Sequence, residues 1–125
     1  MSSVAVDALI GVHDRVALWH VDTEGAEMIV LRSAARLFAE GRVDRVILEW
    51  EPERFGAYGV AVADAVAFVT KLFDGWACRR LCETNVDWSR QYAWGHHHDV
   101  YCVRPGLVDS DPAVGFPASA CSNIG

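Results

Sequence analysis

The 125-residue sequence lacks any long apolar run, and it is poor in positive charge. No segment approaches the roughly 18 consecutive apolar residues of a membrane-spanning helix, and the first ten residues lack the basic start and apolar stretch of a signal peptide. With 11 basic against 17 acidic residues, the net charge of −6 argues against nucleic acid or an anionic membrane as the principal partner. We therefore expect a cytoplasmic protein of one domain at most.

Several catalytic signatures are also absent. There is no G-x-x-x-x-G-K-[ST], which excludes a phosphate-loop ATPase. A barrel glycosidase, which also places paired carboxylates after strands, needs roughly 250 residues, about twice this length. The four cysteines, Cys78, Cys82, Cys102 and Cys121, have no spacing typical of a disulfide framework, so we expect reduced thiols.

Histidines and cysteines near the end of the chain raise the alternative of a zinc site. His96, His97 and His98 are consecutive, and Cys78, Cys82 and Cys102 lie nearby in the predicted sheet. Imidazole and thiolate ligands suit zinc. However, there is no C-x-x-C, and scattered buried cysteines usually only fill space in a core. We therefore expect no metal site.

A strand followed by a helix is the centre of the sequence pattern. Residues 16–21 are apolar and rich in β-branched and aromatic side chains, which is typical of a strand covered on both faces. The turn-forming residues 22–25 follow, and over 26–38 the apolar residues recur at helical spacing. Gly41 is a natural C-terminal stop for this helix.

Later segments complete a predicted sheet. We expect strands at residues 45–50, 76–81 and 99–103, a loop at 52–59 and an amphipathic helix at 60–73. The helix between the first two strands implies that they run parallel with a right-handed crossover. No helix separates the last two strands, so they should pair antiparallel. The predicted fold class is an α/β sheet of about four strands, two parallel and then an antiparallel pair, with covering helices.

Acidic residues follow the first two predicted strands. Asp22 and Glu24 lie in the first turn, Glu27 begins the helix, and Glu49 and Glu51 end the second strand. Because the carboxyl ends of parallel strands meet at one edge, we expect a negative pocket suited to a cation, a substrate amine or hydroxyl, or a divalent metal. One carboxylate there could act as a base. The alternative is that Glu24 and Glu27 only cap the free amides of the helix.

Three segments carry a family resemblance. VDALIGVHDRVALWHVDTEGAEMIVLRSA, residues 6–34, resembles the region around the Asp-x-Glu-Gly-Ala-Glu motif of the FkbM-type methyltransferases. VDRVILEWEP, residues 43–52, is similar to the family's fifth strand with its terminal acid, and HDVYCVRP, residues 98–105, is similar to its final strand. One departure is His20, at a place where the family usually has Lys or an apolar residue.

The resemblance implies a partial Rossmann-like, class I methyltransferase fold and methyl transfer from S-adenosylmethionine to a small-molecule hydroxyl or amine. Asp22, Glu24 and Glu49 fall on motif positions and would be catalytic, positioning or deprotonating the acceptor. Glu27 and Glu51 would contact the substrate.

Aromatic residues precede the last predicted strand. Trp88, Tyr92 and Trp94 could form a stacking wall for a substrate ring, with Trp88 as the candidate contact. The alternative, which we favour, is that these side chains cover an exposed hydrophobic face of a short sheet.

The family's cofactor-binding half has no counterpart in this sequence. That half contains a strand, a glycine-rich turn and an acidic residue. Gly56 and Gly59 follow a strand here, but they form no tight G-x-G. The resemblance therefore implies a carboxyl-terminal half of the methyltransferase domain at residues 16–104. We expect a leader at 1–15 and a flexible tail at 105–125. S-adenosylmethionine is not expected to bind tightly to this chain alone.

The family order would place the first strand, residues 16–21, in the middle of a larger sheet, beside a strand that this sequence lacks, so here it becomes an edge. An apolar strand with unpaired backbone groups is a pairing hazard. We therefore expect the chain to be unstable alone, to form a homodimer through residues 16–21, or to bind a partner that supplies the missing half. The alternative function is that of a non-catalytic, truncated or decayed domain that acts as an interaction module or has no activity.

Overall fold

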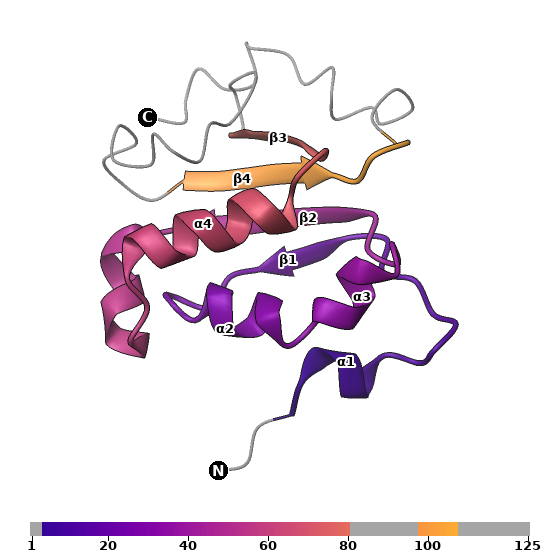
Figure 1. The fold of residues 1–125 in the computed structure, drawn as a ribbon, viewed down its shortest axis with the longest axis horizontal. Coiled ribbons are helices and arrows are strands. Elements are labelled where there is room, and N and C mark those ends of the chain that lie inside the picture. Colours follow the sequence, from indigo (N-terminus) through magenta and orange to yellow (C-terminus); the bar gives the residue numbers. More distant parts are fainter. Residues whose placement is uncertain (1–3, 81–97, 108–125) are drawn as a thin grey trace.

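The computed structural model describes residues 4–80 and 98–107 (Figure 1). Its elements in chain order are α1 (Val6–Leu9), β1 (Trp19–Val21), α2 (Glu27–Arg32), α3 (Ala35–Ala39), β2 (Arg45–Trp50), the 3-10 helix η1 (Pro52–Tyr58), α4 (Val62–Leu72), β3 (Ala77–Arg80) and β4 (His98–Val103). The predicted aromatic segment with Trp88, Tyr92 and Trp94, and the predicted tail beyond residue 107, lie outside the described residues.

The described strands form one mixed sheet in the order β1-β2-β4-β3. β1 and β2 are parallel, with Val21 level with Leu48. β4 runs antiparallel to both β2 and β3. The predicted four-stranded α/β sheet is therefore confirmed, including the parallel first pair, the antiparallel last pair and the position of β1 at an edge.

The helices cover one face of this sheet (Figure 1). On β2 the alternate residues Val46, Leu48 and Trp50 are fully buried, and they belong to a core cluster that includes side chains of α2, α3 and α4. The expectation that the first strand is covered on both faces is wrong. His20 is exposed and Leu18 is 53% exposed, because no helix among the described residues covers that side.

The first strand is also shorter than predicted. Val16 makes an isolated parallel bridge with Val43, and its amide donates to the carbonyl of Arg42 at 2.8 Å. Residues 17 and 18 then leave the ladder, and regular pairing resumes only at Trp19. Apolar character over residues 16–21 therefore overestimates the length of β1.

The single helix predicted over residues 26–38 is divided into α2 and α3. At the break, the Ser33 hydroxyl donates to the Val30 carbonyl at 2.7 Å. The carboxylate of Asp7, in the leader helix α1, accepts hydrogen bonds from the amides of Arg36 at 2.9 Å and Leu37 at 3.1 Å. These are amides at the start of α3 that have no partner within their own helix. The helix breaks where a distant side chain supplies a cap.

Most of the loop predicted over residues 52–59 is instead the 3-10 helix η1 (Pro52–Tyr58), followed by Gly59 in a left-handed conformation with φ 72°. The amphipathic helix predicted over 60–73 is confirmed as α4, whose Ala65 and Val69 are buried. Among the described residues no single helix is long and apolar enough to cross a membrane. η1 and α4 meet that test only as a pair, and the pair is bent by 105°.

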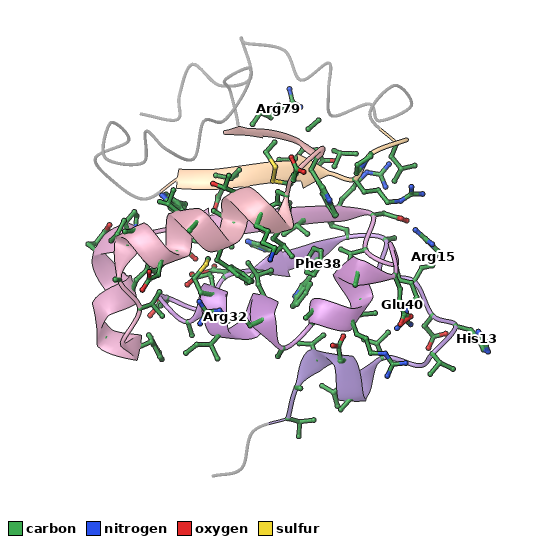
Figure 2. All side chains as sticks on the ribbon, viewed as in Figure 1. His13, Arg15, Arg32, Phe38, Glu40 and Arg79 are labelled. Atoms are coloured by element: carbon green, nitrogen blue, oxygen red, sulfur yellow. A yellow bond between two sulfur atoms is a disulfide. The ribbon has the colours of Figure 1, made fainter. Side chains whose placement is uncertain are left out.

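A ring cluster closes one end of the core. Figure 2 shows Phe38 of α3 directed toward the sheet. Its ring centroid lies 6.2 Å from that of Trp19, 6.0 Å from Phe73 and 5.8 Å from Trp76. These side chains join β1, α3 and the connection from α4 to β3, so helix and sheet meet through aromatic contacts.

Cys78 of β3 and Cys102 of β4 are paired in the antiparallel ladder and form a disulfide. The prediction that the cysteines are reduced is wrong for these two. Their sequence separation of 24 carries no recognisable spacing, because strand register, not sequence distance, brings them together. In this oxidised form neither sulfur is available as a zinc ligand.

An ion-pair network lies at the rim of the sheet where β1 and β2 begin and β4 ends. Asp44 precedes β2, and its Oδ1 accepts hydrogen bonds from Arg15 Nη2 at 2.6 Å and Arg104 Nε at 2.7 Å. Burial alone would raise the pKa of the Asp44 carboxyl, but these hydrogen bonds and the two guanidinium charges outweigh it and hold the pKa below its ordinary value. The network connects the approaches to β1 and β2 with the end of β4.

Candidate functional site

The turn after β1 has an unusual backbone. Glu24 has φ 53° and Gly25 has φ 113°. A Cβ at Gly25 would lie 2.5 Å from the carbonyl oxygen of Arg54, so only glycine fits there. The glycine of the Asp-x-Glu-Gly motif thus lets the turn pack closely on η1.

Glu27 closes this turn from inside. Its side chain is fully buried, and its carboxylate accepts hydrogen bonds from the amide of Gly25 at 2.8 Å and that of Thr23 at 3.4 Å. A carboxylate at this position satisfies free amides and favours the positive end of α2. The sequence left capping of the helix as an alternative role for Glu27, but its carboxylate binds amides of the turn that precedes α2.

Arg54 of η1 links two of the predicted acids. Its Nε lies 2.7 Å from Glu51 Oε2, and its Nη1 lies 3.5 Å from Glu24 Oε2. The Glu51 side chain is 9% exposed and that of Glu24 is 73% exposed. The pair with Glu24 is long and solvated, so it contributes little, whereas Glu51 is held next to a guanidinium.

Asp22 and Glu49 lie at one rim of the sheet, as predicted. They follow the paired residues Val21 and Leu48 of two parallel strands, which sets them level with each other. Since Leu48 faces the helices, Glu49 belongs to the opposite face by alternation along the strand. Asp22 is exposed, and Glu49 is 5% exposed.

Sequence reasoning missed Asp99, the ladder partner of Glu49 on β4. It extends the row of acids to a third strand. The signal for it was the antiparallel register, which the sequence does not reveal. Arg54 was also missed, although its position three residues after Glu51 was a local signal for the ion pair.

The five predicted acids have different partners among the described residues. Glu27 accepts from amides of the turn, Glu24 and Glu51 contact Arg54, and Asp22 and Glu49 lie where β1 and β2 end. Within residues 4–80 and 98–107, no group of three or more His, Cys, Asp or Glu side chains could hold a metal ion. Trp88, His96 and His97 lie outside the described residues.

The described residues do not fit a cradle for S-adenosylmethionine. The space beside Gly25 is filled by the backbone of Arg54. An added Cβ at Gly56 would meet nothing within 4 Å. A glycine that lets a cofactor approach the backbone follows a strand in a tight turn. β2 is instead followed by the 3-10 helix Pro52–Tyr58.

Scans of protein-family models, of curated proteins and of solved structures find no match to this chain. The case for a function therefore rests on the motif around Asp22 and on the rim where β1 and β2 end.

Proposed function

We propose that this chain is the acceptor side of an FkbM-like, Rossmann-type methyltransferase domain. Its role is in methyl transfer from S-adenosylmethionine to a small-molecule hydroxyl or amine. The observation that carries the proposal is the parallel register of β1 and β2, which sets the exposed Asp22 level with Glu49 at one rim. In open α/β sheets, ligands bind outside the carboxyl ends of parallel strands.

The acids of the rim have separate tasks in this proposal. Asp22 orients the acceptor and takes the proton from its hydroxyl or amine, a role for which a solvent-accessible carboxylate is suited. Glu24 assists from the turn, where it can exchange its long contact with Arg54 for one with the acceptor. Glu49 supports Asp22 from the neighbouring strand.

The methyl donor is held elsewhere. S-adenosylmethionine supplies the methyl group when bound, and the described residues offer it no glycine-rich turn. The proposal therefore includes a partner that adds strands beside β1, whose second edge pairs with no strand among the described residues. A strand pairs readily with such an edge because its amides and carbonyls are available.

Methyl incorporation tests the catalytic proposal. A tagged chain is isolated from its native cells with whatever it binds, and tritium from methyl-labelled S-adenosylmethionine is followed into small molecules. Asp22→Asn should lower incorporation by about a hundredfold, the lower range for loss of a general base. Asp64→Asn, which changes an exposed acid in the first turn of α4, should leave it unchanged.

Equal incorporation by Asp22→Asn and the original chain would remove Asp22 from the chemistry. Absence of incorporation above the level of a mock isolation would overturn the catalytic proposal as a whole.

A second candidate is a non-catalytic interaction module. Its supporting observation is that Glu27 and Glu51 are engaged in contacts that stabilise the turn, while one edge of β1 pairs with no strand among the described residues. Calorimetric titration with S-adenosylmethionine separates the candidates. The module predicts no heat from either the isolated chain or its complex, whereas the methyltransferase predicts binding by the complex only.

A further inference from the structure

The Cys78–Cys102 disulfide fastens an edge strand. β3 pairs only with β4, through residues Ala77–Arg80, and it ends the strand order of the described sheet. β4 pairs in addition with β2 along six residues of each strand. The covalent link therefore joins an edge strand with one partner in the described sheet to a strand that is held from both sides.

Ring contacts lie on either side of the link. Arg79 stacks over the ring of Tyr101, with 5.9 Å between its guanidinium carbon and the ring centroid. Trp76 packs on Phe73 just before β3 begins, with 5.2 Å between centroids. Both cysteines belong to the core cluster, together with side chains of β1, β2, α2 and α3.

We propose that the Cys78–Cys102 disulfide is a redox latch, whose reduction by a dithiol releases β3 from the sheet while β1, β2 and β4 stay paired. As whole residues, Cys78 is 9% exposed and Cys102 is fully buried, so the proposal takes Cys78 Sγ as the sulfur that an incoming thiolate attacks.

The exchange is balanced by the dithiol itself. Its thiolate bonds to Cys78 Sγ, the Sγ–Sγ bond breaks, and Cys102 leaves as a thiolate that takes up a proton. The second thiol of the reagent then displaces Cys78 and closes the reagent into its own disulfide. The protein gains two electrons and two protons, and the dithiol loses them.

Hydrogen exchange on the full chain tests the latch. Cys82→Ser and Cys121→Ser are introduced first, so that only the Cys78–Cys102 pair titrates, and dithiothreitol is the reductant. Reduction should speed amide exchange in β3 by about a hundredfold, because the cross-link no longer restricts the open state. Amides of β2 should exchange at the same rate in both redox states.

The variant Cys78→Ala/Cys102→Ala should reproduce the exchange of the reduced chain without any reductant. If this variant fails to fold, the reduced chain decides by itself. Unchanged exchange in β3 on reduction would overturn the latch, and so would equal loss of protection in β2 and β3, since that result means global unfolding.

Discussion

Single residues in the Asp-x-Glu-Gly-Ala-Glu segment have distinct physical duties. Glu27 accepts hydrogen bonds from amides inside the turn, and Gly25 allows the close approach of Arg54. Only Asp22 and Glu24 of this segment expose their carboxylates. In this motif Gly25 and Glu27 therefore stabilise the tight turn, and only Asp22 and Glu24 have carboxylates available for chemistry.

Gly25→Ala should destabilise the fold strongly. The added Cβ would meet a backbone oxygen at 2.5 Å in a conformation with φ 113°, so either the turn or η1 must move. We expect a loss of about 2–4 kcal/mol in the free energy of unfolding, measured by urea denaturation.

Gly41→Ala is the matched control for that substitution. Gly41 also has positive φ, at 65°, but an added Cβ would meet nothing within 4 Å. Its cost should be only that of the left-handed backbone, about 1 kcal/mol. Equal losses for the two substitutions would show that the contact with Arg54 has no energetic weight.

At the scale of elements, the leader helix α1 decides how the first crossover is built. Asp7 reaches the start of α3, and the amide of Val6 donates to the Ser33 hydroxyl at 3.1 Å. Asp7 lies in the segment 6–34 that carries the family resemblance, but its contact with α3 is visible only in the fold. The break between α2 and α3 thus depends on a tertiary hydrogen bond.

Asp7→Ala should lower the free energy of unfolding by about 1–2 kcal/mol, the range for loss of a helix cap. Two amides of α3 would lose their acceptor, so their hydrogen exchange should also accelerate. Asp64→Ala, in the first turn of α4 but without a capping bond, should change stability by less than about 0.5 kcal/mol. A similar loss for both would contradict the capping role.

At the scale of the whole molecule, Asp44 connects parts of the chain that are distant in sequence. Its carboxylate pairs with Arg15 and Arg104, and its backbone carbonyl accepts from the amide of Arg104 at 2.9 Å. Because β1, β2 and β4 all begin or end near this network, its loss should affect global unfolding rather than one strand.

The network predicts a definite pH dependence of stability. The folded pKa of Asp44 lies below the unfolded value of 3.8, so its stabilisation is present above pH 3.8 and is lost as the pH falls toward the folded pKa. Asp44→Asn should cost about 1–2 kcal/mol at neutral pH, a figure reduced by the partial exposure of Arg15.

The difference between Asp44→Asn and the original chain should shrink as the pH falls below about 4, measured by urea denaturation across pH. Glu53→Gln, an exposed acid of η1, serves as the control and should show no such convergence. A difference that stays constant with pH would show that the ionised carboxylate is not the source of the stabilisation.

Local pattern determined much of the architecture. The apolar run that ends in Glu49 and Trp50 is confirmed as β2 with its predicted bounds, Arg45–Trp50, and helical spacing located α4. The crossover rule placed β1 and β2 parallel, and with them Asp22 level with Glu49. These features depend on neighbouring residues in the sequence or on the general handedness of crossover connections, so the sequence alone suffices to derive them.

Tertiary structure alone decided which acids share a face, which amides Asp7 caps and which cysteines pair. In the sequence, Cys78 and Cys102 are simply two cysteines 24 positions apart. The register of β3 and β4 places them opposite each other, where they form a disulfide. Likewise Glu51 became a partner of Arg54, while Glu49 became a neighbour of Asp99. Side-chain partners across a sheet follow from strand register and packing, and these are properties of the whole chain rather than of any segment.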